Sequence, residues 1–100
     1  MGLMDELEKI KGTLKERWVA HYKANRAWIR DQMNYSSQFY ATTSDGGTRP
    51  SNAFILGCIS ALEPEFATYI PFFLQLNRDA DKLIEILGLD FDVEKLLNPN

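Results

Sequence analysis

The chain has 100 residues, a formal net charge of −3 at pH 7 and 45% hydrophobic residues. This length and composition predict one folded domain with a single core and exclude a disordered chain. The negative charge argues against nucleic acid as a partner, because nucleic-acid-binding proteins neutralise phosphates with Lys and Arg. A membrane span is also excluded, because Glu63, Pro64 and Glu65 interrupt the longest apolar stretch, Ala53 to Leu76.

Charge is divided unevenly along the chain. Residues 1–33 hold seven Lys and Arg against five Asp and Glu, whereas residues 51–100 hold three against eight. Such asymmetry is typical of two faces that attract each other within one fold. The alternative is a site for a basic partner on the acidic half.

The first 33 residues predict one long amphipathic helix. Trp28 lies beside its apolar stripe, so either a second element covers Trp28 or it faces a partner. The stripe follows the three-and-four spacing of one helix face and consists of Leu3, Leu7, Ile10, Leu14, Trp18, Tyr22, Ile29 and Met33.

Residues 34–50 predict a short β-hairpin or an ordered loop. Asp45-Gly46-Gly47 is a strong turn signal, because glycine accepts positive φ without steric cost. Arg49 follows the turn and precedes Pro50, which disfavours a helical conformation for it. We therefore expect Arg49 to be presented rigidly, either to the acidic half of the chain or to a partner protein.

Residues 51–97 predict a helical core. Ser51 is placed to cap a helix that continues to Leu62 and is apolar nearly all round, which favours a buried, central position. A second helix is expected over residues 64–76, with a kink at Pro71.

Two further capping signals follow. Asp79 is placed to cap another helix, and Gly88 is a plausible end for it. Asp90 or Asp92 could cap a last short turn. The sequence thus predicts a single, mainly α domain over residues 1–100. We expect a small orthogonal or bundle-like packing of about four helices, with a short β-hairpin around residues 38–50.

No constellation of catalytic or metal-binding residues is apparent in the sequence. Cys58 is the only cysteine and lies in an apolar run, so we expect a buried thiol, and His21 is the only histidine. The stretch from Asn77 resembles the start of a calcium loop. Its sixth and twelfth positions are Lys82 and Gly88, where glycine and glutamate are needed. We therefore expect no enzyme activity, no metal and no cofactor.

A surface for a protein partner is the remaining candidate site. Trp and Arg dominate the binding energies of protein interfaces. The candidate partner-binding residues are Trp28, Arg26, Arg30 and Arg49.

Several segments resemble a family of short, uncharacterised cyanobacterial proteins known only as a domain of unknown function. They cover roughly residues 14–92 and contain no known catalytic signature. The resemblance implies a cytoplasmic protein with a link to photosynthesis or its assembly. The segments are Trp18-x3-Tyr22-x2-Asn25-Arg26-x-Trp28-Ile29, Asp45-Gly46-Gly47-Thr48-Arg49-Pro50-Ser51, Ile55-Leu56-Gly57, Ala61-Leu62-Glu63-Pro64 and Leu76-Asn77-Arg78-Asp79-Ala80-Asp81-Lys82-Leu83.

Two functional hypotheses follow from these observations. The first is a non-catalytic protein–protein interaction module, acting as an assembly factor or regulatory adaptor. The second is a small-ligand or pigment-binding protein that uses the apolar region around Phe54, Phe66, Phe72 and Phe73.

Overall fold

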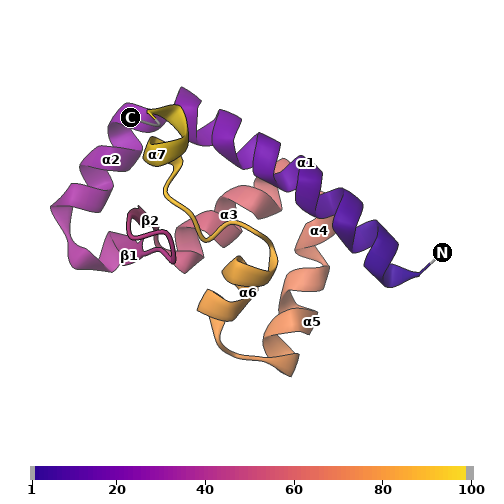
Figure 1. The fold of residues 1–100 in the computed structure, drawn as a ribbon. Coiled ribbons are helices and arrows are strands. Elements are labelled where there is room, and N and C mark those ends of the chain that lie inside the picture. Colours follow the sequence, from indigo (N-terminus) through magenta and orange to yellow (C-terminus); the bar gives the residue numbers. More distant parts are fainter. Residues whose placement is uncertain (1, 99–100) are drawn as a thin grey trace.

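The computed structural model describes residues 2–98, apart from the side chains of residues 3, 4, 6 and 7. The chain is mainly helical with one short antiparallel hairpin, as predicted (Figure 1). The elements are α1 (Leu3–Ala24), α2 (Arg26–Tyr35), the 3-10 helix η1 (Ser37–Phe39), β1 (Tyr40–Thr42), β2 (Thr48–Pro50), α3 (Asn52–Leu62), α4 (Pro64–Ala67), α5 (Tyr69–Leu76), α6 (Ala80–Ile86) and α7 (Val93–Leu97).

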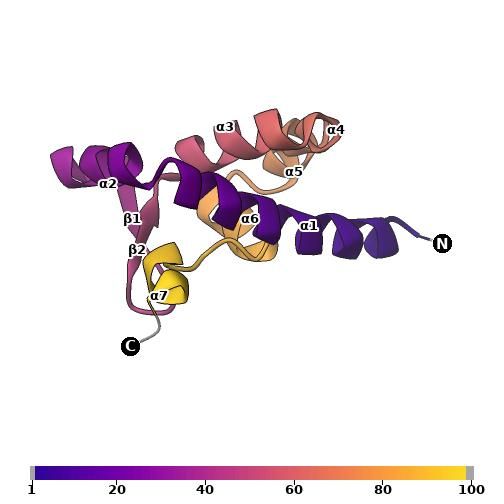
Figure 2. The same ribbon diagram turned by 90° about the horizontal axis from the view of Figure 1, so that it is seen from above.

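Helix α1 runs along one side of the molecule, and α3, α4, α5 and α6 pack beneath it (Figures 1 and 2). The hairpin and α7 lie side by side at the end of the molecule nearest α2 in both views. Arg17 anchors α1 to the end of α3. Its Nη1 donates to the Leu62 carbonyl at 2.7 Å and lies 3.0 Å from Glu63 Oε1. The basic first half and the acidic second half therefore do attract each other within the fold.

The prediction of a single helix over residues 1–33 is wrong, because the helix is interrupted at Asn25. The Asn25 backbone N–H donates to the carbonyls of both His21 and Tyr22, and its side-chain Nδ2 donates again to the His21 carbonyl. An Asn side chain that bonds nearby backbone competes with the helical ladder in this way. Helix α1 therefore ends at Ala24, and α2 begins at Arg26.

The apolar stripe itself is confirmed across this break. The side chains of Leu3 and Leu7 lie outside the described residues. Ile10 and Met33 are partly buried against the core, and the remaining stripe residues are fully part of it. The buried core consists of Leu14, Trp18, Tyr22, Ile29, Ile55, Ile59, Phe66, Leu83, Ile84, Leu87, Leu89 and Val93.

Helix α3 is less buried than its composition predicts. Only Ile55 and Ile59 are buried, whereas Ala53, Gly57 and Ala61 are exposed along the opposite side. A domain of this size has too few elements to surround a central helix. Helix α3 therefore lies at the edge of the core, although its composition suggested the centre.

The helix predicted over residues 64–76 is also divided, and its break lies at Thr68 before Pro71 is reached. Pro71 has no N–H for the Ala67 carbonyl, and its ring would collide with that carbonyl in a continuous helix. Ending α4 at Ala67 places Pro71 in the first turn of α5, where backbone N–H groups have no helical partner. These breaks, together with α7, raise the number of helices above the four expected.

Local signals elsewhere are confirmed, with two differences. Gly46 (φ 81°) forms the hairpin turn, and Gly88 (φ 77°) ends the segment after α6. Asp79 and Asp92 cap α6 and α7 with their carboxylates. Ser51 does precede α3, but its hydroxyl makes no capping bond. The extended segment begins at Tyr40, because Ser37–Phe39 form η1.

Trp18→Ala should lower the free energy of unfolding by about 3–5 kcal/mol, because the ring is 0% exposed and its loss leaves a cavity. Urea denaturation followed by circular dichroism measures this change. Tyr35→Ala is the matched control. It removes an aromatic ring that is 80% exposed and should change stability by about 0.5 kcal/mol or less. Equal effects of the two substitutions would contradict the assigned core.

Candidate functional site

Trp28 is a half-exposed aromatic residue of α2, and neighbouring side chains hold its ring in place. Its indole Nε1 donates to Asn25 Oδ1 at 2.8 Å. The ring meets Phe54 of α3 edge to face, with 5.6 Å between centroids. Trp28 is nevertheless 48% exposed. It therefore presents an ordered aromatic surface to solvent.

An apolar groove of about 230 Å³ lies beside Trp28 and is named here the Trp28 groove. Helices α2 and α3 form its walls, with η1 and the end of β2 between them. Gln32 and Ser51 supply polar atoms, and none of the lining residues ionises near neutral pH. The groove is lined by Trp28, Ile29, Gln32, Met33, Phe39, Pro50, Ser51 and Phe54. Such a lining suits apolar contact rather than acid–base chemistry.

Of the eight lining residues, only Trp28 and Phe54 were among the residues predicted for a partner or a ligand, and the other six were not. Met33 and Ile29 were assigned to the core stripe, and Pro50 to the exit of the turn. Phe39 belonged to the segment expected to be extended. A spacing of four places Ile29 and Met33 on one face of α2, but only the folded chain brings Phe39 and Pro50 to that face.

Arg26 and Arg30 lie on the other flank of α2, where they face α7. Arg26 Nε and Nη2 donate to the two carboxylate oxygens of Glu94 at 2.8 and 2.6 Å. The Tyr22 hydroxyl donates to the same carboxylate at 2.9 Å. Arg30 Nη1 lies 3.9 Å from Glu94 Oε1 and is the more loosely held guanidinium. The Arg26 guanidinium is thus bound to Glu94 of α7, whereas about half of the neighbouring Arg30 side chain remains exposed to solvent.

These contacts shift the pKa values of the groups involved. The Arg26 hydrogen bond holds the pKa of Glu94 below its ordinary value of 4.5. Burial raises the pKa of Tyr22, and the neighbouring Glu94 carboxylate raises it further. Both shifts favour the arrangement seen, in which Glu94 is ionised and Tyr22 keeps its proton.

Arg49 is buried, with 2% of its surface exposed. Its Nε lies 3.0 Å from Asp90 Oδ1, its Nη2 lies 3.3 Å from Asp81 Oδ1, and its Nη1 donates to the Pro50 carbonyl at 3.0 Å. Of the two roles expected for Arg49, these contacts support pairing with the acidic half of the chain. Arg49 therefore does not belong to the candidate partner surface with Trp28.

The four phenylalanines of the ligand hypothesis lie in different surroundings in the described part of the chain. Phe66 is buried in the core, and Phe54 lines the Trp28 groove. Phe72 is 53% exposed on α5, and Phe73 lines a separate hollow between α5 and α6. An apolar ligand could therefore contact only some of these four phenylalanines at one time.

Cys58 and His21 occupy ordinary structural positions. The Cys58 side chain is half-buried rather than fully buried as expected, and burial raises the pKa of its thiol. A nucleophilic cysteine needs the opposite shift. The His21 ring lies 6.4 Å from the Trp18 ring in a stacked arrangement.

Among the described residues, no group of three or more His, Cys, Asp and Glu side chains is arranged to hold a metal ion. No helix in the described part of the chain is long and apolar enough to cross a membrane.

Comparison with known proteins identifies the family. Residues 4–100 match the model described as "Family of unknown function (DUF5331)", and the chain belongs to this family. Neither the curated proteins nor the solved structures contain a match to the chain.

Arg49→Ala should lower the free energy of unfolding by about 3 kcal/mol, because Asp90 would remain largely buried without its cation. Arg78→Ala removes the same guanidinium from an exposed position and should cost about 0.5 kcal/mol or less. Chemical denaturation of both variants measures the difference. If Arg49→Ala were as stable as the wild type, the ion pairs of Arg49 would contribute little to the free energy of unfolding.

The depressed pKa of Glu94 predicts acid sensitivity. The pKa of Glu94 in the folded state lies below its ordinary value of 4.5. The ionised carboxylate therefore stabilises the fold at a pH above 4.5, and this contribution is lost as the pH falls through the folded-state pKa. Thermal melts between about pH 6 and about pH 3 should show a falling melting temperature. The slope should be smaller in Glu94→Gln, which cannot ionise. Parallel slopes for the two proteins would exclude Glu94 as a source of the pH dependence.

Proposed function

We propose that this member of a family of unknown function is a non-catalytic interaction module that binds another protein through the Trp28 groove. The observation that carries this proposal is an ordered, half-exposed tryptophan beside an apolar groove. Tryptophan is among the residues that contribute most to interface energies. An adaptor or assembly factor needs a surface of this kind and no reaction chemistry.

The ordered state of Trp28 favours binding energetically. Immobilising a flexible side chain at an interface costs roughly 0.5–1.5 kcal/mol. The hydrogen bond to Asn25 and the edge-to-face contact with Phe54 already fix the indole. A partner that covers this ring therefore gains the apolar contact with little further loss of side-chain entropy.

The size of the groove supports one inserted side chain of a partner protein. Its volume of about 230 Å³ is below the roughly 300–1,000 Å³ typical of small-molecule pockets. A buried cavity of roughly 150 Å³ can hold benzene, so an aromatic or branched aliphatic side chain is of suitable size. Gln32 and Ser51 lie where they could bond to the backbone of such a partner.

The cellular setting is proposed from sequence resemblance alone. The resemblance of several segments to short cyanobacterial proteins favours a cytoplasmic adaptor with a link to photosynthesis. This step rests on association with a group of organisms and not on the chemistry of the groove.

A small apolar ligand is the second candidate for the same groove. The apolar lining with two polar groups is compatible with it, although the volume is small for a pigment. Native mass spectrometry of protein purified from its own organism distinguishes the two. A co-purifying mass lost in Trp28→Ala would favour the ligand.

Immobilised wild-type protein should retain a partner protein in stoichiometric amount from a lysate of its own organism. Trp28→Ala should bind this partner with an affinity lower by roughly 30-fold or more, which corresponds to a hot spot of about 2 kcal/mol. Phe72→Ala is the matched control, because Phe72 has a similar exposure of 53% and lies on α5. Quantitative mass spectrometry of the eluates gives the ratio. Equal retention by all three proteins would contradict a role for the Trp28 groove.

A further inference from the structure

The hydrogen-bond register of the hairpin decides which backbone groups face its two outer edges. Beside the turn, the Thr43 N–H donates to the Gly47 carbonyl. In an antiparallel pair, such bonded positions alternate with positions whose N–H and C=O groups point away from the other strand. The pairing of β1 with β2 keeps this register, so the backbone groups of Tyr40 and Thr42 point away from β2.

The outer edge of β2 is already used within the fold. The Thr48 N–H donates to Asp92 Oδ2 at 3.1 Å. The Pro50 carbonyl accepts a hydrogen bond from Arg49 Nη1 at 3.0 Å, and proline has no N–H of its own. This edge therefore offers no free backbone N–H to a further strand.

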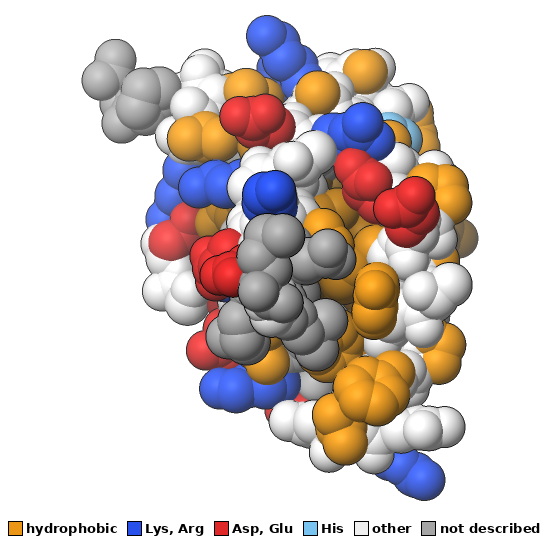
Figure 3. Space-filling model, turned by 90° about the vertical axis from the view of Figure 1, so that its right-hand side faces the viewer, with side chains coloured by type: hydrophobic (Ala, Val, Ile, Leu, Met, Phe, Trp, Pro, Cys, Tyr) orange, Lys and Arg blue, Asp and Glu red, His pale blue; other side chains and the backbone are white. Residues whose placement is uncertain are grey.

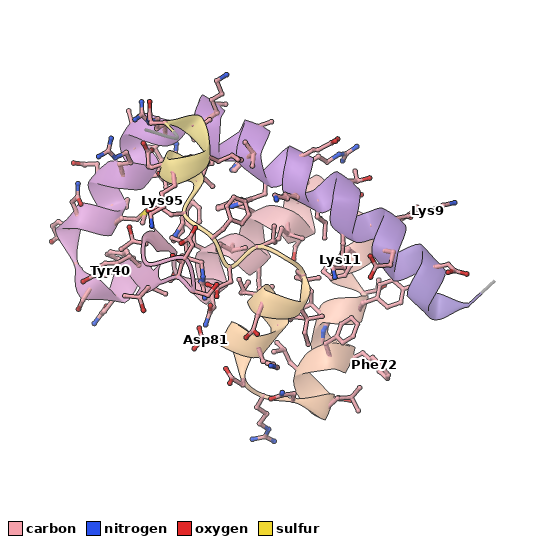
Figure 4. The ribbon with its side chains drawn as sticks, viewed as in Figure 1. Lys9, Lys11, Tyr40, Phe72, Asp81 and Lys95 are labelled. Carbon is pink, nitrogen blue, oxygen red and sulfur yellow. The ribbon has the colours of Figure 1, made fainter. Side chains whose placement is uncertain are left out.

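The outer edge of β1 is open. In the described part of the chain, the Tyr40 carbonyl and both backbone groups of Thr42 make no hydrogen bond away from β2. Tyr40 is 39% exposed, and Thr42 is exposed as well. Figure 4 shows Tyr40 at the periphery of the molecule, near the end of α2. Acceptor, donor and acceptor thus follow one another along an exposed edge.

The usual protections of an exposed edge, other than its shortness, are missing from β1. Natural edge strands carry charged side chains or proline, which prevent pairing with another chain. β1 has neither, and residues 32–44 contain no charged residue at all. An edge of this kind is complementary to the backbone of an extended polypeptide, which presents donors and acceptors at the same spacing.

A polar hollow of about 470 Å³ lies beside the hairpin. Tyr40 and Thr48 line it and lie on one face of the hairpin, because side chains alternate along each strand. A strand added to β1 would place every second side chain over this face. The other lining side chains used here come from the end of α2 and the residues after it, and are Asn34, Tyr35, Ser36 and Ser37.

The composition of this hollow suits a polypeptide without charge. Tyrosine supplies contact area at low entropy cost, and Ser and Asn adapt their hydrogen bonds, as in the protein-binding loops of antibodies. Tyr35 is 80% exposed, and its ring lies 6.3 Å from the Phe39 ring between centroids. A charged side chain would find no opposite charge among the lining residues. The side of the molecule that carries α4 and α5 gathers hydrophobic side chains instead (Figure 3).

A second copy of the chain fits this edge less well than a longer extended segment. The copy would have to offer its own β1, which is extended over only three residues. η1 ends directly before β1, and the turn follows soon after it. A partner segment that is extended over more residues can follow the edge and also reach the hollow.

We infer that the outer edge of β1 binds an extended, uncharged segment of a partner protein as a third strand. The backbone of the segment pairs with Tyr40 and Thr42, and its alternate side chains lie over the polar hollow. This surface is separate from the Trp28 groove and does not depend on the function proposed for that groove.

Selection of linear twelve-residue peptides from a display library tests this inference, with immobilised Trp28→Ala as the target so that the groove does not contribute. Enriched peptides should lack charge at their centre and should shift the NMR signals of the Thr42 amide and of Tyr35. N-methylation of one alternate set of peptide nitrogens should weaken binding by roughly 10-fold or more, because these N–H groups donate to β1. Methylation of the other set should have little effect, since those groups face solvent.

Thr42→Pro is the corresponding change in the protein. It removes an outward N–H and leaves the bonds to β2 intact, as Pro50 does in the opposite strand, so its melting temperature should match the parent protein. Its affinity for the selected peptides should fall by roughly 10-fold or more. Thr42→Val is the matched control, because it keeps the N–H and the branched shape, and it should bind like the parent protein.

Three results would overturn the inference: no enriched peptide, equal effects of the two methylation sets, or undiminished binding by Thr42→Pro. A dimer of the wild-type protein in sedimentation equilibrium that Thr42→Pro abolishes would also overturn it, because a second copy would then occupy the edge. The methylation result needs no change in the protein, so it holds even if Thr42→Pro alters the hairpin.

Discussion

The buried guanidinium of Arg49 is the constraint on which the arrangement of the chain depends. A charge that is 2% exposed needs partners, and Asp81, Asp90 and the Pro50 carbonyl provide them. These partners belong to β2, to α6 and to the segment that leads to α7. One side chain therefore joins the middle of the sequence to its end. The hairpin is held because its departure would leave both Arg49 and the largely buried Asp90 unpaired.

The hairpin in turn positions both α7 and the Trp28 groove. Its tip contacts the segment before α7, where the Thr48 N–H donates to Asp92 Oδ2 at 3.1 Å and the Asp92 N–H donates to Asp45 Oδ2 at 3.2 Å. Gly47 permits this approach, because a Cβ there would lie 2.6 Å from the Asp92 Cβ. At its other end, β2 places Pro50 against the groove. The same ion pairs that close the fold thus shape the surface proposed for a partner.

A chain of this size has more apolar surface than its core can cover. Two parts of that surface differ in character: the Trp28 groove has polar atoms from Gln32 and Ser51, whereas α5 has no charged residue and leaves Phe72 and Leu76 exposed. Exposed apolar groups of this kind mark interaction surfaces more often than scattered single residues do, which is the physical reason to expect the Trp28 groove to be covered in use.

The sequence by itself determined several local features: the apolar stripe of α1 and α2, the turn at Asp45-Gly46-Gly47, and the caps at Asp79 and Gly88. It left open a hairpin or an ordered loop after α2, and Asp90 or Asp92 as the last cap; the structure shows the hairpin and the Asp92 cap. Each feature that the sequence determined depends on helical periodicity or on hydrogen bonds between near neighbours, so nearby residues suffice to predict it. Only the tertiary structure decided that Arg49 is buried, that Phe39 and Pro50 meet Trp28, and that α5 is exposed. These outcomes depend on which elements pack together across tens of residues, and an apolar helix has the same sequence pattern whether or not another surface covers it.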